Sequence, residues 1–281
     1  MLHVSTGALV SLVIIMLICF VMPFALFYIL YRYADCKVKT LITGAAAYIA
    51  CGVIADTIIA ASLDRIGGIN GNSLLYLLHV TILSPVLFIL INYLVIRKFG
   101  ADNMNTTGDS MMYALGYSSA FNILSTGLIA IMYFLTLIDI RDNSEKYLVV
   151  SDANYVSASG TVSGSNVVNE SIYKEMINLC NQPVSYYMNF IINCLWVIAA
   201  YAAIMLVIWL AVKKSEKVIL LAFAFVIRLF STLPDILQHF NMIKNTWVSH
   251  LISIVILVII WTAAVFCRKT FIDRDDAVKG E

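Results

Sequence analysis

The sequence predicts an all-α protein that crosses a membrane about seven times. Hydrophobic residues make up 61% of the 281 residues and charged residues only 12%, and several apolar runs reach the about 20 residues that a helix needs to cross a bilayer. A soluble domain of this size would carry far more Lys and Glu on its surface. So few charges also leave no basic face for nucleic acid. We therefore expect a multi-pass protein of a cell membrane, most simply a bacterial plasma membrane, with the lipid bilayer as a partner and no nucleic acid.

The first apolar run lies at the start of the chain. The stretch MLHVSTGALVSLVIIMLICFVMPFALFYILYRY has no basic n-region. Its apolar part is too long for a signal peptide, and no small-residue cleavage site follows it. We expect it to be retained as the first span.

Seven spans can be drawn from the hydropathy pattern, with boundaries good to a few residues. Pro23 and Pro234 fall inside spans and predict kinks, because proline removes one backbone hydrogen bond and crowds the preceding turn. The small residues of TGAAAYIACG (43–52) favour close helix packing in lipid. The expected spans are residues 7–31, 40–63, 74–96, 110–138, 186–212, 217–240 and 247–267.

Basic residues alternate between the connections. They cluster after the first, third, fifth and seventh spans, and the other connections carry few of them. By the positive-inside rule the N-terminus lies outside and the C-terminus inside, which agrees with an odd number of spans. The predicted organisation is four spans in 1–138, an extracytoplasmic loop in 139–185, three spans in 186–268 and a cytoplasmic tail in 269–281.

The long loop has two parts. Its first part, SDANYVSASGTVSGSNVVNES, shows no helical periodicity. Its second part, NESIYKEMINLC, predicts a short amphipathic helix with Asn169 as N-cap and with Ile172, Met176 and Leu179 on one face. We expect this helix to lie on the outer surface of the membrane.

The six cysteines do not indicate a metal site or a disulfide framework. They include no C-x-x-C pair, and most lie in apolar runs, where cysteine behaves as a small hydrophobic residue. They are Cys19, Cys36, Cys51, Cys180, Cys194 and Cys267.

Three ionisable side chains within the spans stand out: Asp56, Arg228 and Asp235. Each costs roughly 2.5–3.5 kcal/mol on insertion scales, so each is a functional candidate. Counted from the cytoplasmic ends of their spans at 1.5 Å per residue, both carboxylates lie roughly 25 Å up and Arg228 roughly 16 Å up. Because arginine can extend along an apolar surface, we expect a structural ion pair between Arg228 and Asp56 or Asp235.

Three histidines, His79, His239 and His250, lie near the predicted outer boundary, as do Asp56 and Asp235. Carboxylates and imidazoles of this kind can bind zinc, and a zinc-bound water can hydrolyse a peptide. The sequence contains no H-E-x-x-H, and the i, i+4 spacing of Asp235 and His239 falls beside a proline. We expect these residues to be structural and interfacial, with no cofactor, and zinc only if the chain is a hydrolase.

The layout of the chain resembles a known family. The resemblance is clearest in STGALVSLVIIMLICFVMPFALFYILYRY, in ITGAAAYI behind it, and in LAFAFVIRLFSTLPDILQHFNMIKNTWVSHL near the end. In these stretches the chain resembles the YhfC family of intramembrane peptidases, distant relatives of the CAAX-protease-like (CPBP) membrane proteases. The resemblance covers nearly the whole chain and implies the helical fold of that family.

The polar residues on which the family's hydrolysis depends are missing. The family carries a Glu-Glu pair and Arg in the third span, Gly-His-Gly-Gly and Glu in the fourth, Glu-Arg and His in the fifth, and His and Asp before the proline of the sixth. These groups would hold or activate a hydrolytic water. Here spans three to five contain no Glu, and their only histidine is His79. The corresponding positions carry Phe88, Ile89, Asn92, Tyr117, Phe121, Asn193, Tyr201 and Thr232.

Three functions follow as hypotheses. The first is a non-catalytic pseudoprotease that binds a membrane protein or a peptide as a chaperone, tether or immunity-type factor. The second is an active intramembrane metallo- or glutamic-type peptidase with an unconventional set drawn from Asp56, Asp235, His79, His239 and Arg228. The third is a transporter component with a site near the midplane.

The uncharged polar residues of the spans leave two alternatives open. Tyr117, Asn122, Asn193 and Tyr201 can satisfy one another between the helices, as such side chains do in membranes. They can instead line a small polar cavity that holds a peptide or lipid segment.

Overall fold

The computed structural model describes residues 4–34, 36–67, 73–100, 103–142, 178–180, 182–214, 217–243 and 245–279. This part of the chain contains seven helical segments long and apolar enough to cross a membrane, and no strand. The predicted all-α, seven-span class is confirmed, and the predicted boundaries are within a few residues of those observed for six spans. The segments are Thr6–Tyr33, Val38–Ile66, Leu74–Phe99, Thr107–Asp142, Val184–Lys213, Lys217–His239 and Trp247–Phe271.

The last helix is longer than predicted. It is α13 (Thr246–Lys279), so the segment expected as a tail from residue 269 continues as helix. Residues 143–177 lie outside the described part of the chain, and with them most of the amphipathic helix predicted around Asn169, Ile172 and Met176. That helix and the membrane orientation of the termini stay predictions.

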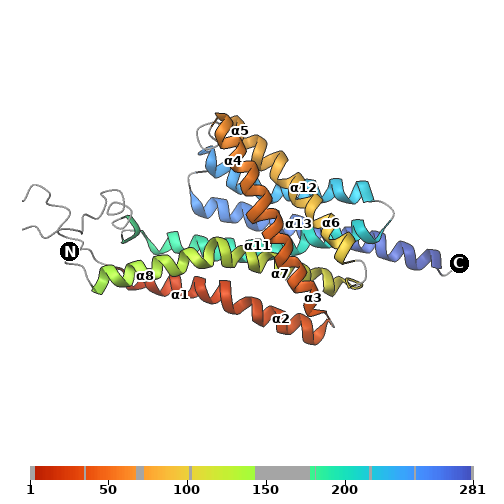
Figure 1. Ribbon diagram of the computed structural model, residues 1–281, viewed down its shortest axis with the longest axis horizontal. Coiled ribbons are helices and arrows are strands. Elements are labelled where there is room, and N and C mark those ends of the chain that lie inside the picture. The colour runs from red at the N-terminus through yellow and green to blue at the C-terminus, as the bar shows by residue number, and fades with distance from the viewer. Residues whose placement is uncertain are drawn as a thin grey trace, which may run out of the picture.

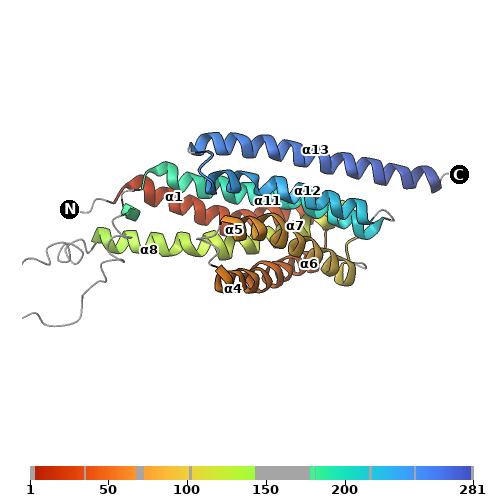
Figure 2. The same ribbon diagram turned by 90° about the horizontal axis from the view of Figure 1, so that it is seen from above.

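Helix α11 (Val184–Lys213) is the central element of the bundle (Figures 1 and 2). It packs against α12 (Lys217–His239) and α13, and also against helices of the first, third and fourth spans. Of its most apolar stretch, 61% is buried, against 17 to 33% in the other spans. A helix that is apolar all round is expected inside a bundle, and α11 has that character.

Each of the first four spans contains a π-helical segment between α-helical parts. Such wide turns are rare in proteins, and those that occur are often found at functional sites. The α-helical parts are α1 (Thr6–Met16), α2 (Met22–Tyr33), α3 (Val38–Tyr48), α4 (Asp56–Gly67), α5 (Ser73–Leu78), α6 (Ser84–Phe99), α7 (Thr107–Phe121) and α8 (Leu128–Asp142). The π-helical segments are η1 (Leu17–Val21), η2 (Ile49–Ala55), η3 (His79–Leu83) and η4 (Asn122–Gly127).

Two of the π-helical segments end two residues before a proline. A proline ring crowds the carbonyl four residues earlier, and for Pro23 and Pro85 these residues are Cys19 and Thr81, within η1 and η3. The wider turn gives the ring room at that point. Pro234 instead lies inside α12 without a π-helical segment.

Helices α3 and α7 approach each other closely at two glycines. A Cβ added to Gly44 would collide with the carbonyl oxygen of Tyr113, and one added to Gly116 would collide with the carbonyl oxygen of Leu41. The backbones can touch only because neither position has a side chain. The close packing predicted from the small residues of 43–52 is thereby confirmed.

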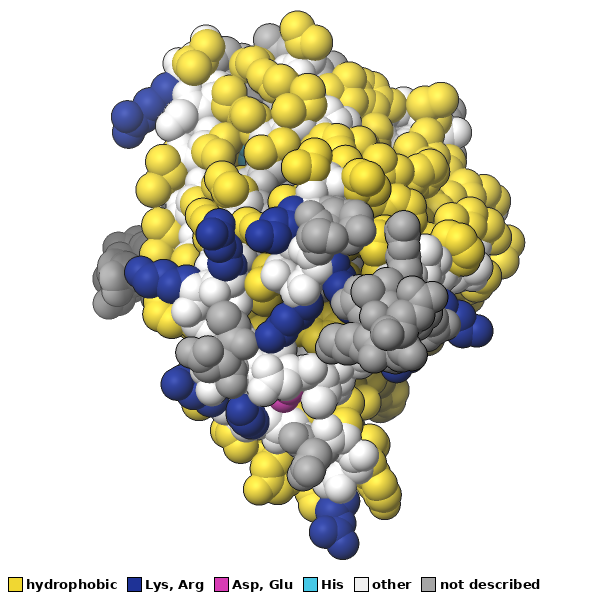
Figure 3. Space-filling view, turned by 90° about the vertical axis from the view of Figure 1, so that its right-hand side faces the viewer, with side chains coloured by type: hydrophobic (Ala, Val, Ile, Leu, Met, Phe, Trp, Pro, Cys, Tyr) yellow, Lys and Arg dark blue, Asp and Glu magenta, His cyan; other side chains and the backbone are white. Residues whose placement is uncertain are grey.

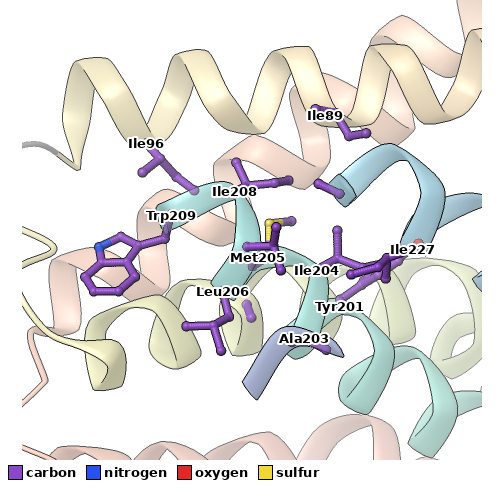
Figure 4. Packing of buried hydrophobic residues seen from close by; sticks show 14 of the residues in the cluster. Ile89, Ile96, Tyr201, Ala203, Ile204, Met205, Leu206, Ile208, Trp209 and Ile227 are labelled. Atoms are coloured by element: carbon purple, nitrogen blue, oxygen red, sulfur yellow. The ribbon is translucent and has the colours of Figure 1, made fainter. Parts of the chain in front are cut away.

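The hydrophobic core surrounds the second half of α11 (Figure 4). Residues 203–211 are all nearly or fully buried, and Ile96 of α6 and Ile227 of α12 pack against them. At the end of this stretch the Trp209 indole Nε1 donates a hydrogen bond of 3.0 Å to the carbonyl oxygen of Met104. This contact ties α11 to the connection between α6 and α7.

Lys and Arg side chains gather at one end of the molecule (Figure 3). Basic residues occupy the last turns of α2, α6 and α11, namely Arg32, Arg97, Lys98 and Lys213. This is the end that the positive-inside rule assigns to the cytoplasm.

Candidate functional site

The resemblance to the YhfC family implies a replaced polar residue at eight positions, which we call the replaced positions. Four of them meet as aromatic rings. The ring centroid of Tyr117 lies 5.3 Å from those of Phe88 and Tyr201, and the centroid of Phe121 lies 6.0 Å from that of Tyr201. Most of these pairs are edge-to-face, the arrangement that aromatic quadrupoles favour. Tyr48 of α3 completes this group of five rings, which we call the aromatic cluster.

Two further replaced positions are satisfied within the core. Asn92 is fully buried: its Oδ1 accepts a hydrogen bond of 2.7 Å from the Tyr113 hydroxyl, and its Nδ2 donates one of 2.8 Å to the carbonyl oxygen of Phe88. Ile89 is buried in the same hydrophobic core. These residues stabilise packing and offer no group to a ligand.

A cavity of about 330 Å³ lies between η4, α11 and α12, beside the aromatic cluster. We call it the central cavity. It includes the remaining two replaced positions, Asn193 and Thr232, and three of the four polar residues considered above, Asn122, Asn193 and Tyr201. Its lining residues are Phe121, Asn122, Ser125, Thr126, Phe190, Asn193, Trp196, Val197, Ala200, Tyr201, Arg228, Ser231, Thr232 and Asp235.

One face of α12 supplies the charged wall of the central cavity. Arg228, Ser231, Thr232 and Asp235 follow the i, i+3, i+4, i+7 spacing that places side chains along one stripe of a helix. The Ser231 hydroxyl donates to the carbonyl oxygen of Arg228 at 2.7 Å and accepts from a terminal guanidinium nitrogen of the same arginine at 3.1 Å. Ser231 therefore holds the guanidinium along this face.

Arg228 does not form the ion pair expected from the sequence. In the described part of the chain its guanidinium makes no salt bridge to Asp56 or Asp235. It lies over the rings of Phe88 and Tyr201, 5.1 and 5.2 Å from their centroids, where the negative ring faces attract a cation. Its Nε is buried and has no hydrogen-bond partner among the described residues.

Asp56 pairs with His79 instead. Nε2 of His79 donates to Oδ1 of Asp56 at 3.1 Å, with the two side chains 13% and 33% exposed. Asp56 begins α4 directly after η2, and His79 begins η3, so the pair joins the second and third spans at two π-helical segments. Asp56 therefore has an imidazole partner, whereas the guanidinium of Arg228 lies over aromatic rings.

The other candidate histidines lie at separate places. The ring of His239 stacks on Tyr76 of α5 at a centroid distance of 3.6 Å. Nε2 of His250 donates to Oδ1 of Asn189 at 2.8 Å. Among the residues that the structure describes, no group of three or more His, Cys, Asp or Glu is arranged to hold a metal ion.

Besides Arg228, two further side chains of the central cavity have unused polar atoms. Asn122 is 1% exposed: its Nδ2 donates to the carbonyl oxygen of Cys194 at 3.0 Å, and its Oδ1 has no partner in the described residues. Asp235 is exposed and forms no hydrogen bond within the described part of the chain. A carboxylate in this situation is costly against hydrocarbon, so the central cavity is suited to water or a polar ligand.

The sequence contains a pattern that predicts this wall, although hydropathy alone does not detect it. Arg228, Ser231 and Asp235 share a helical stripe that can be read from their spacing alone. By contrast, nothing in the spacing of Ser125 or Trp196 indicates that they line the same cavity, because they come from spans whose relative rotation is set by packing.

Comparison with known proteins identifies no relative. No protein-family model, curated protein or solved structure matches the chain.

Proposed function

We propose that this chain is an integral membrane protein that binds a ligand without catalysing a reaction. It would share the helical fold of the YhfC-type peptidases. The observation that carries the proposal is the location of the replaced positions. Phe121, Asn193, Tyr201 and Thr232 line the central cavity, and Phe88 and Tyr117 pack directly behind it. These positions carry aromatic, amide and hydroxyl side chains, which can bind a ligand, and they carry none of the Glu or His groups that would hold or activate a water in the family.

The central cavity has the composition of a small-molecule site. Such sites are typically about 300–1,000 Å³, with aromatic walls and a few polar groups that fix orientation, and a volume of about 330 Å³ lies at the lower end of that range. Phe121, Phe190, Trp196 and Tyr201 supply the aromatic walls. The ligand is therefore a compact molecule or the end of a peptide or lipid segment.

Filling the cavity tests the proposal. Ala200 lines the central cavity and is 1% exposed, so Ala200→Phe places a ring in the ligand space. The same change at exposed Ala61 of α4 is the matched control. Organic extracts of the purified proteins are compared by mass spectrometry.

We expect a compound that co-purifies with the wild type and with Ala61→Phe and is depleted in Ala200→Phe. Val197→Trp, which fills the same space from the next turn, should deplete it too, which separates filling from a local folding defect. Equal amounts of every compound in all four proteins would overturn the proposal.

The hydrogen bond between Asp56 and His79 favours a second candidate, the peptidase hypothesis. A carboxylate that orients an imidazole is a common arrangement in general-base catalysis. Nε2 of His79 and Oδ1 of Asp56 lie 3.1 Å apart. Asp235 lies apart from this pair, in the wall of the central cavity. Peptide hydrolysis that is lost in both Asp56→Asn and His79→Asn would favour this candidate.

A further inference from the structure

Two opposite charges face the central cavity without direct contact between them. Arg228 and Asp235 both line it, and no salt bridge joins them in the described structure. They are seven residues apart on one face of α12, which separates their Cα atoms by roughly 10 Å along the helix at 1.5 Å per residue. This leaves space for a ligand between the two charged groups.

Building on the proposed function, we infer that the ligand of the central cavity is a small zwitterion. Its anionic group contacts the Arg228 guanidinium and its ammonium group contacts the Asp235 carboxylate. One molecule then supplies the direct ionic partner that each side chain lacks in the described structure. Charge-assisted hydrogen bonds of this kind are the stronger ones in proteins.

Two residues of the cavity wall also have buried polar atoms without a partner. Nε of Arg228 is a buried donor without an acceptor, and Oδ1 of Asn122 is a buried acceptor without a donor, among the described residues. Leaving such atoms unpaired has a cost that a ligand bearing both an anion and an N–H group removes. The aromatic walls of Phe121 and Trp196 give its apolar part a surface to pack on.

Two smaller cavities share wall residues with one another or with the central cavity and lie toward the beginnings of α11 and α13. The first, of about 60 Å³, shares Asp235 and Asn193 with the central cavity and extends to His250. The second, of about 140 Å³, shares His250 with the first and extends to Ser185 and Trp247, in the first turns of α11 and α13.

Because neighbouring cavities share wall residues, we take this series of cavities as a polar route to one end of the bundle. Ser249, Ser253 and Gln238 add polar groups to the first of the two smaller cavities. A route of this kind suits a zwitterion that arrives from water, such as an amino acid or a short peptide with free ends. The headgroup of a zwitterionic lipid carries the same two charges, and the experiment distinguishes the two sources.

The test uses the full-length protein in nanodiscs of phosphatidylglycerol, a lipid without an ammonium group. The probe is the dipeptide glycyl-phenylalanine, compared with its N-acetyl form, which lacks the cation, and its C-terminal amide, which lacks the anion. Binding is measured by calorimetry and by the thermal unfolding midpoint. We expect the dipeptide to bind and to raise the midpoint, and each blocked form to bind about tenfold or more weakly, as for loss of one charged hydrogen bond.

Variants locate the two contacts. Arg228→Gln and Asp235→Asn should each weaken dipeptide binding about tenfold or more, and Arg228→Lys, which keeps the cation, should retain most of it. Arg141→Gln and Asp142→Asn make the same chemical changes at an exposed ion pair on α8, away from the cavity, and should leave binding unchanged. The unfolding midpoint without dipeptide shows whether each variant is folded.

A second experiment with a zwitterionic lipid shows whether the ligand is a free molecule or a lipid headgroup. If the dipeptide has no effect but nanodiscs of phosphatidylethanolamine stabilise the protein through both Arg228 and Asp235, the zwitterion is a lipid headgroup. Blocked dipeptides that bind as tightly as the free one, or no dependence on both charges in either arm, would overturn the inference. If Ala200→Phe depletes a co-purified compound that carries a single charge or none, only this inference fails and the proposed function stands.

Discussion

Oδ1 of Asp56 and Nε2 of His79 lie 3.1 Å apart and link the second span to the third. Asp56 directly follows the π-helical segment η2, and His79 is the first residue of η3. The pair is separate from Arg228, so the two polar features of the spans have different partners. One joins helices, and the other faces the central cavity.

The first prediction concerns this pair. Asp56→Asn and His79→Leu should each lower the free energy of unfolding, and the double variant should lose less than the sum, with a coupling of about 0.5–3 kcal/mol as expected for residues in contact. The free energies of unfolding of the wild type, the two single variants and the double variant are measured by reversible denaturation in detergent. Neither variant should change dipeptide binding. Strictly additive losses would show that the hydrogen bond does not form.

The second prediction concerns the crossing of α3 and α7. Gly44→Ala and Gly116→Ala each push a methyl group into the backbone of the other helix, and overpacking of this kind costs about 1–3 kcal/mol. Ala46→Val adds bulk to the exposed side of α3 and is the control. Thermal unfolding should show lower midpoints for both glycine variants only. Midpoints equal to that of the control would contradict the close approach.

The third prediction concerns the buried hydrogen bond between Tyr113 and Asn92. Tyr113→Phe leaves Oδ1 of Asn92 without its donor in the core, which costs about 1–3 kcal/mol. Adding Asn92→Leu removes the unpaired amide as well, so the double variant should be more stable than Tyr113→Phe alone. If the second change only adds to the loss, the amide is satisfied by another group.

The fourth prediction concerns the contact of the first and fifth spans. Sγ of Cys19 and Sγ of Cys194 lie 3.6 Å apart in the interior, close enough to reach disulfide distance with a small movement. A membrane-permeant oxidant such as copper phenanthroline should join them within one chain, seen by mass spectrometry of proteolytic fragments. Cys19→Ser or Cys194→Ser should prevent this cross-link, whereas Cys267→Ser should not. A cross-link between other cysteines instead would place α1 and α11 in a different register.

Much of the fold could be predicted from hydropathy, because the bilayer imposes the length and composition of each span. The close contact of α3 and α7 could also be predicted, since only small residues allow helices to touch. The π-helical segments could not, because no residue type marks them apart from the prolines that follow two of them. The segment η2, which contains Gly52, illustrates this, because its sequence does not differ in composition from other stretches of small residues.

The site was predicted less completely, for a reason that Arg228 illustrates. Its burial in a span indicated that it needs a partner, and acidic residues were the obvious candidates. The partner depends on the rotation of several helices, and this brought Phe88 and Tyr201 under the guanidinium and His79 to Asp56. The residue spacing within α12 predicts which of its side chains lie on one face. The packing between helices determines which residues of other helices that face contacts.

The most direct test of non-catalytic binding follows the fate of the bound compound. The wild-type protein is incubated in heavy-oxygen water with the compound that Ala200→Phe depletes, and the compound is recovered and weighed by mass spectrometry. Hydrolysis would insert heavy oxygen into a new carboxylate and shorten the molecule. We predict that the compound is recovered intact and without heavy oxygen. Labelled fragments that disappear in Asp56→Asn and His79→Asn would contradict the account.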